Sequence, residues 1–296
     1  MSLSRREFLQ MLALAGAAGF GLSGCDSSKK APKPGAGAAN PYELPPFGNV
    51  SLLHFTDCHA QLIPTYFREP NINIGLAASQ GKAPHLVGDA LLKHFNIAPG
   101  GMEAHAFTYL NFEEAARKYG KVGGFAHLAT LVKTMREQRK GRSLLLDGGD
   151  TWQGSATALW TKGQDMVDAC KLLGVDIMTP HWEFTLGAAR VKEIVEKDFA
   201  GSIEFLAQNV SDATWGELIF KPYVIRELNG VRVAVIGQAF PYTPIANNRF
   251  AFPDWSFGIN DDRMQKTVDK TRAEGAQVVV VLSHNGMDVD LKMASR

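Results

Sequence analysis

Strand-like and helix-like hydrophobic patterns alternate along the chain from residue 50 onward. Short apolar runs before polar residues are typical of buried strands, and apolar residues spaced by three or four are typical of helices. Strands are predicted at residues 50–55, 143–146, 176–179, 203–208 and 277–282, and helices at residues 122–140, 164–173, 188–198 and 261–274. Residues 223–236 fit a hairpin, because Asn229 and Gly230 suit a type I′ turn. Four consecutive valines indicate that the last strand is buried on both faces. This order predicts an α/β layered fold with a mixed sheet.

Residues 64–120 interrupt the alternation. They contain Pro64, Pro70, Pro84 and Pro99 and show little periodicity. Long insertions in compact domains commonly serve as lids or binding loops, so we expect an insertion of this kind after the first strand.

The first 24 residues are typical of an export signal. Arg5 and Arg6 lie in a Ser-Arg-Arg-Glu-Phe-Leu run that matches the twin-arginine pattern, and an apolar stretch rich in Ala and Gly follows. Cys25 ends a Leu-Ser-Gly-Cys run, which fits either a lipidation site or an ordinary cleavage site with an incidental Cys. Residues 25–49 are rich in Lys, Pro, Gly and Ala and predict a flexible linker. We therefore expect a periplasmic protein, tethered to the membrane if Cys25 carries a lipid anchor.

The composition excludes several classes of protein without naming a function. Of the 296 residues, 45% are hydrophobic and 21% are charged, which is close to the average for soluble globular proteins. The net charge of +1 lacks the basic excess usual in nucleic-acid-binding proteins, so no nucleic-acid partner is expected. Three cysteines are too few for a disulfide framework. The chain is therefore not a collagen, a disulfide-rich toxin, a polytopic membrane protein or a wholly disordered chain.

Polar residues gather directly after the predicted strands, at the ends where open α/β sheets bind ligands. These residues are Asp57 and His59, then Asp147, Asp150 and Gln153, then His181 and Glu183, then Asn209, and finally His284 and Asn285. Each cluster alone is weak evidence for a functional site, because an isolated His after a strand commonly has a structural role. Together, His and Asp at successive strand ends suit a centre for two hard or borderline metals, bridged by one carboxylate at a separation of about 3.5–4 Å.

Four of these segments, in this order, resemble the calcineurin-like metallophosphoesterases of the 5′-nucleotidase branch. The segments are LHFTDCH at 53–59, GGDTWQG at 148–154, PHWEF at 180–184 and LSHNG at 282–286. Within that branch, the runs TDCHAQ and HWEFT most resemble the thiosulfohydrolases of bacterial sulfur-oxidising (Sox) systems. The resemblance covers residues 50–296 and implies a layered α/β/β/α sandwich with mixed sheets, incomplete at its C-terminus.

The resemblance also implies two divalent metal ions, with Mn as the expected metal. By this resemblance, Asp57 and His59 bind the first metal, Asp150 bridges both metals, and His284 binds the second. His181 stands where the nucleotidase pattern has an Asn ligand.

The same resemblance assigns Trp182 and Glu183 to shaping the catalytic site. Trp182 stands where nucleotidases carry a catalytic His, and Thr185 stands where the Asp partner of that His is expected. A sulfur leaving group needs protonation less than an alkoxide does, so the loss of this His fits S–S hydrolysis better than phosphate-ester hydrolysis. Alternatively, Trp182 only fills space.

The implied reaction is the release of sulfate from a Cys-S-thiosulfonate on a sulfur-carrier protein, the expected partner. Two other functions remain open: a periplasmic 5′-nucleotidase or phosphodiesterase, and a non-catalytic metal- or carrier-binding protein. Residues 291–296 look like the start of a helix, and the family's Gly-His-x-His or Gly-His-x-Gln segment and its C-terminal substrate domain are absent from the sequence. We therefore expect an N-terminal fragment of the enzyme that is inactive by itself.

Overall fold

The computed structural model describes residues 47–66, 75–108 and 112–296. The chain divides into two units, Met1–Leu44 and Pro45–Arg296, and every described residue belongs to the second unit. The predicted export signal, Cys25 and most of the predicted linker lie outside the described residues. Among the helices that are described, none is long and apolar enough to cross a membrane.

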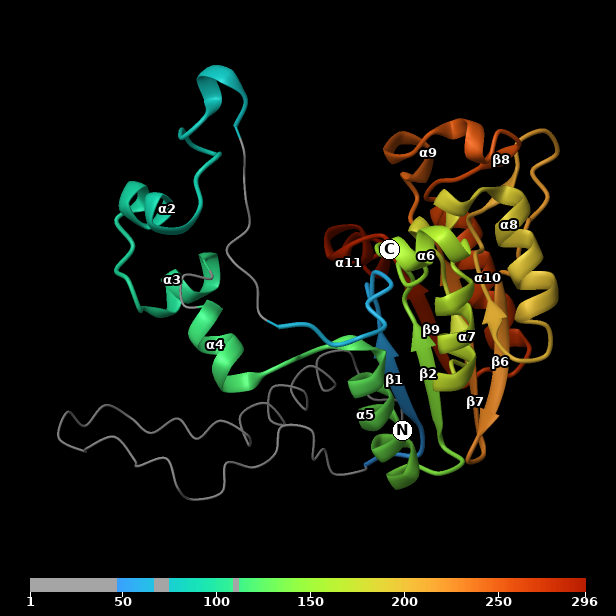
Figure 1. Cartoon of the computed structure of the whole chain (residues 1–296). Coiled ribbons are helices and arrows are strands. Elements are labelled where there is room, and N and C mark those ends of the chain that lie inside the picture. Colours follow the sequence, from blue (N-terminus) through green and yellow to red (C-terminus); the bar gives the residue numbers. More distant parts are fainter. Residues whose placement is uncertain (1–46, 67–74, 109–111) are drawn as a thin grey trace. The chain divides into compact units, whose positions relative to one another are not determined.

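A parallel four-stranded sheet contains the first four strands, in the order β1-β2-β3-β4. Figure 1 shows its first two strands, β1 and β2, side by side. The strands are β1 (Ser51–Phe55), β2 (Ser143–Asp147), β3 (Ile177–Met178) and β4 (Glu204–Phe205). The helices between them are α5 (Gly124–Gln138), α6 (Ala156–Thr161), α7 (Gln164–Leu173) and α8 (Ala188–Glu193), which continues as the π-helical turn η3 (Ile194–Asp198). Because the strands are parallel, their carboxyl ends share one edge of the sheet.

A mixed three-stranded sheet has the order β6-β7-β9. Its strands are β6 (Tyr223–Leu228), β7 (Val231–Gln238) and β9 (Val278–Ser283). Asn229 and Gly230 have φ values of 49° and 75°, as a type I′ turn requires, so the predicted hairpin is confirmed. β7 and β9 run parallel, and α10 (Asp261–Ala273) contacts both of these strands. A further two-stranded sheet pairs β5 (Ser211–Asp212) with β8 (Trp255–Ser256).

Two apolar cores establish the layers of the fold. One packs α5 and α7 against the parallel sheet and includes Phe125, Met166 and Cys170. The other lies between the two sheets and includes Leu146, Val235 and other side chains from β2, β3, β7 and β9. Helices therefore cover the parallel sheet, the two sheets face each other, and α10 covers the mixed sheet. The predicted α/β/β/α architecture is confirmed, with one parallel sheet and one mixed sheet.

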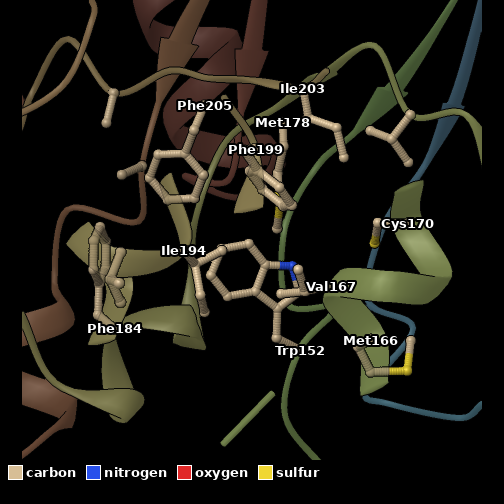
Figure 2. Close-up of a cluster of buried hydrophobic side chains, with 14 of the residues drawn as sticks. Trp152, Met166, Val167, Cys170, Met178, Phe184, Ile194, Phe199, Ile203 and Phe205 are labelled. Carbon is tan, nitrogen blue, oxygen red and sulfur yellow. The ribbon is translucent and has the colours of Figure 1, made fainter. Parts of the chain in front are cut away.

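The first core also anchors the segment that follows β2. Figure 2 shows the Trp152 indole among apolar side chains, where its ring lies 5.3 Å from that of Phe199 and 5.7 Å from that of Phe205. Trp152 is fully buried, and truncation of such a side chain typically costs about 3–5 kcal/mol. Since Trp152 follows Asp150 by two residues, the core fixes the backbone that carries this carboxylate.

The prediction that the valine-rich strand is buried on both faces is wrong. Val278 and Val281 of β9 are 40% and 38% exposed, although Leu282 is buried. Among the described strands, β9 pairs with β7 alone, so it lies at an edge of the mixed sheet. Hydrophobic composition cannot distinguish an edge strand from a central one when the neighbouring strand is unknown.

The segment 64–120 contains more regular structure than its sequence predicts. It includes the short helices η1 (Ala77–Ser79), α2 (Gly88–Phe95), α3 (Met102–Phe107) and α4 (Phe112–Tyr119). The last helix, α11 (Met287–Ala294), begins before the predicted start near residue 291, with Gly286 as its N-cap residue. The remaining short helices are η2 (Trp182–Leu186), α9 (Thr243–Ala246) and η4 (Arg249–Ala251).

Candidate metal centre

Four loops at the carboxyl ends of the strands carry the predicted ligands. Asp57 and His59 follow β1, Asp150 follows β2, His181 follows β3 and His284 follows β9. The register pairs Phe55 with Asp147 and Asp147 with Met178, so the first three loops begin at the same level of the parallel sheet. The parallel sheet therefore brings together Asp57 and His181, which are 124 positions apart in the sequence, and His284 comes from β9 of the mixed sheet.

Backbone hydrogen bonds join the first two loops. The Asp57 N–H donates to the Gly149 carbonyl at 2.9 Å, and the His59 N–H donates to the Asp150 carbonyl at 2.9 Å. Gly149 has a φ of +93°, and a Cβ atom at this position would lie 2.4 Å from the Thr179 carbonyl oxygen. Glycine is thus required where the loops after β2 and β3 approach each other.

Three of the predicted ligands adopt left-handed backbone conformations. The φ values are 56° for Asp57, 46° for His59 and 63° for Asp150. Such conformations cost about 1–3 kcal/mol for residues other than glycine and cluster at functional sites. The surrounding hydrogen bonds therefore hold these side chains in orientations that a relaxed loop would not keep.

The five predicted ligands form two groups that share one carboxylate. Asp57, His59 and Asp150 make one group, and Asp150, His181 and His284 make the other, with candidate ligand atoms within 4.8 Å of one another in each. Oδ2 of Asp150 lies 3.3 Å from Nε2 of His59 and 3.0 Å from Nδ1 of His181. Asp150 is thus placed as a bridge between two adjoining sites.

The hydrogen bonds of the two later histidines fit metal ligation. Nδ1 of His284 lies 2.6 Å from the Gly148 carbonyl oxygen, so Nδ1 donates and Nε2 carries the free lone pair. That Nε2 lies 3.8 Å from Oδ1 of Asp57. Nε2 of His181 is buried and has no hydrogen-bond partner among the described residues, as expected for a nitrogen that ligates a metal. Carboxylate and imidazole donors suit Mn²⁺ and Zn²⁺, so the residues fit a pair of divalent cations.

The surroundings of Asp150 favour its ionised form. Burial alone would raise the pKa of this carboxyl group. The hydrogen bond and charge of His181, the charge of His59 and a hydrogen bond from Gln153 together lower that pKa below its ordinary value. Gln153 also places Nε2 3.3 Å from Nδ1 of His59, so its amide lies between the bridge and a ligand of the first group.

Comparisons with known proteins agree with this geometry. The chain is 39% identical to the sulfate thiohydrolase SoxB of Thermus thermophilus, with a TM-score of 0.69 over 86% of this chain and 47% of that one. It is 28% identical to a snake venom 5′-nucleotidase of Gloydius brevicauda, over 64% of this chain and 33% of the relative. The predicted resemblance to the 5′-nucleotidase branch of the calcineurin-like metallophosphoesterases is confirmed.

A third relative extends the comparison at the level of the fold. A 5′-nucleotidase precursor of Thermus thermophilus, 23% identical, has a TM-score of 0.58 over 83% of this chain and 39% of that one. No protein-family profile matches the chain. The chain spans about half the length of SoxB and about a third of the length of the curated nucleotidases that it matches.

Glu183 binds backbone N–H groups of the loops that carry the predicted ligands. Its buried carboxylate accepts N–H hydrogen bonds from the loop after β2 and from the loop after β3. The donors are Asp150 (3.1 Å) and His181 (2.7 Å) on Oε2, and Thr151 (2.6 Å) and Trp152 (3.3 Å) on Oε1. Glu183 therefore joins the segments that carry two predicted ligands.

Trp182 and Thr185 are both placed in η2, which follows His181 of the group formed by Asp150, His181 and His284. The Trp182 ring is half-buried and meets the His181 ring edge to face at 5.5 Å. The Thr185 hydroxyl donates to the Trp182 carbonyl at 2.6 Å, which closes the turn locally. Position 182 therefore presents an aromatic ring without a titratable group next to His181.

Two further groups behind the loops are held in their neutral forms. Burial, with the negative charge of Glu183, raises the pKa of Asp147 to about 8. Burial, with the charges of Asp147, Asp57 and Glu183, raises the pKa of the Cys58 thiol to about 12. Cys58 is therefore a protonated thiol at neutral pH and belongs to neither ligand group.

Asn209 and Phe240 make contacts that the sequence does not indicate. The Asn209 side chain is used by the backbone, because it donates to the carbonyls of Ala239 (2.8 Å) and Gly258 (3.0 Å). Phe240 follows β7, and its ring packs edge to face on the His181 ring at 4.4 Å, while the His284 ring stacks on His181 at 4.0 Å. The sequence carries no signal for Phe240, since an apolar residue after a strand is not distinctive.

Proposed function

We propose that this chain carries the dinuclear centre of a thiosulfohydrolase, with two Mn²⁺ ions and a thiosulfonated Cys of a sulfur-carrier protein as substrate. In the reaction, a water oxygen bonds to the sulfonate sulfur, and the bond between that sulfur and the neighbouring sulfur of the carrier breaks. The electron pair stays with the carrier, which keeps one proton as a persulfide, and sulfate and the second proton are released. No oxidant or reductant is needed.

The residue at position 182 carries this proposal. An ester's alkoxide leaving group is a strong base, and protonation by a positioned acid contributes about 10²–10⁴-fold to its departure. A thiol has an ordinary pKa of about 8.5, so a sulfur leaving group departs readily as an anion. Trp182 beside His181 cannot supply a proton, which suits the sulfur substrate. The 39% identity to a sulfate thiohydrolase supports the same assignment.

The chain's own residues have defined roles in this proposal. Asp57 and His59 would hold one cation, His181 and His284 would hold the other, and Asp150 would be shared by both. When bound, such cations lower the pKa of a water molecule and offset the negative charge of the sulfonate oxygens. Glu183 keeps Asp150 and His181 in place through the backbone.

We further propose export by the twin-arginine route to the periplasm. Support comes from the Arg5-Arg6 motif and from the name of one relative, a 5′-nucleotidase precursor. Retention of an N-terminal lipid at Cys25 is tested by mass spectrometry of the mature protein.

The decisive assay compares two substrates with full-length protein loaded with Mn²⁺. We expect sulfate release from the thiosulfonated carrier to exceed phosphate release from AMP by a factor on the order of 100 or more. Trp182→His should raise kcat/KM for AMP. The matched control is Trp160→His, because Trp160 lies on α6 and is 76% exposed.

Rapid AMP hydrolysis by the wild-type protein, with no sulfate release from the carrier, would instead support the nucleotidase assignment. Inactivity on both substrates, with no bound Mn²⁺, would support the non-catalytic assignment.

A further inference from the structure

A buried row of side-chain amides crosses between the two sheets beside the metal centre. Gln208 follows β4, Gln238 ends β7 and Asn285 follows β9, and these residues are 0%, 0% and 6% exposed. Nε2 of Gln208 donates to Oε1 of Gln238 at 2.5 Å, and Nε2 of Gln238 donates to Oδ1 of Asn285 at 3.0 Å. We call these three residues the amide row.

The amide row has one direction and ends on a charge. Every amide N–H points toward Asn285, whose Nδ2 donates to the Asp290 carboxylate at 3.0 Å. The Ser283 hydroxyl donates to the same carboxylate oxygen at 2.7 Å. Hydrogen bonds aligned head to tail polarise one another, and a terminal carboxylate strengthens the last of them. Asp290 therefore sets the orientation of all three amides.

The row lies where the backbones of the two sheets approach each other closely. A Cβ atom on Gly237 would lie 2.1 Å from the Leu206 carbonyl oxygen, so the backbones of the two sheets touch here. The Gln208 N–H donates to the Gly237 carbonyl at 2.8 Å. The relative placement of the sheets is therefore fixed at the level of the amide row.

The amide row contacts the loop that carries His284 through the side chain of Asn285, the residue after His284. A backbone hydrogen bond acts beside it, because the His284 N–H donates to the Gln238 backbone carbonyl at 2.9 Å. The other ligands, Asp57, His59, Asp150 and His181, come from loops of the parallel sheet, whereas His284 comes from the mixed sheet. The position of His284 relative to those ligands thus depends on how the two sheets are joined.

We propose that Gln208, Gln238 and Asn285 are positioning residues for the metal centre, which set His284 against the ligands of the parallel sheet. The inference rests on the proposed metal centre but is independent of the substrate. It predicts a selective effect: weakening the row should impair the group of Asp150, His181 and His284, and should leave the group of Asp57, His59 and Asp150 unchanged.

The test is a Mn²⁺ titration of full-length protein, with bound and free Mn²⁺ measured by EPR. Gln238→Leu removes both side-chain hydrogen bonds at the centre of the row. Partners that orient metal ligands typically contribute about 10–100-fold to metal affinity, so we expect one of the two sites to weaken by that factor. The matched control is Gln265→Leu, because Gln265 is exposed on α10 and donates only to Asp269 among the hydrogen bonds described.

Asn285→Asp provides a second variant at the end of the row. It keeps the acceptor for Gln238 but places a second carboxylate against Asp290. We expect the same selective loss, and this variant decides the question if Gln238→Leu does not fold.

Two outcomes would overturn the inference. In one, both Mn²⁺ affinities stay unchanged while the unfolding temperature falls, which would make the row merely structural. In the other, both sites weaken equally. Failure of the wild-type protein to bind two Mn²⁺ ions would count against the metal centre itself and is thus a separate result.

Discussion

Replacement of Glu183 by Gln tests whether one carboxylate holds the loops of the metal centre together. Each Glu183 oxygen accepts two backbone N–H groups, at distances of 2.6–3.3 Å. A Gln side chain has one oxygen and one NH₂ group, so two N–H groups lose their acceptor and face another donor. Hydrogen bonds to a buried charge contribute about 1.5–3 kcal/mol each, which gives an expected loss of about 3–6 kcal/mol.

This loss is large against the typical total stability of about 5–15 kcal/mol. Urea unfolding of the metal-free protein at pH 6 measures the loss of stability. At this pH Asp147 is protonated and exerts little repulsion on Glu183. Mn²⁺ titration of the folded fraction should also show weaker binding, because Asp150 and His181 lose their shared anchor. The control is Glu196→Gln on the exposed side of η3. A loss below about 1 kcal/mol for Glu183→Gln, similar to the control, would refute the reasoning.

Two further predictions concern the same loops. Asp147 has its pKa raised from 3.8 to about 8, so between these pH values the folded protein holds a proton that the unfolded chain releases. The free energy of unfolding of the metal-free protein should therefore fall as pH rises through this window, by up to about 1.4 kcal/mol per pH unit. Urea unfolding of Asp147→Asn should show a smaller change of stability with pH. Equal slopes of stability against pH for both proteins would contradict this. Gly149→Ala should lower the unfolding temperature and weaken Mn²⁺ binding, because its Cβ would lie 2.4 Å from the Thr179 oxygen. Gly201→Ala is the control, since Gly201 also has a positive φ but has open space around it, and an equal effect at both glycines would mean that the close approach is unimportant.

The predicted ligands came together because their positions follow from topology. Parallel strands deliver their carboxyl ends to one edge, so Asp57, Asp150 and His181 could be placed from the alternation of strands and helices. The contacts by which Glu183 would shape the site could not be predicted, because its partners are backbone N–H groups whose identity depends on the loop conformations. The hydrogen bonds of the Gln238 amide could not be predicted either, because hydrogen bonds between two sheets depend on how the sheets are placed relative to each other. Val281 shows the same limit in the fold, because a valine run looks alike in central and edge strands.

A count of bound Mn²⁺ tests the central claim, that Asp150 joins two adjoining metal sites. EPR spectroscopy of the full-length protein should show two Mn²⁺ ions per chain with an exchange-coupled spectrum, as expected for cations about 3.5–4 Å apart. Asp150→Asn should abolish the coupled spectrum and weaken both sites, because both groups share this carboxylate. Two uncoupled ions in the wild-type protein, or the loss of only one site in the variant, would contradict the account.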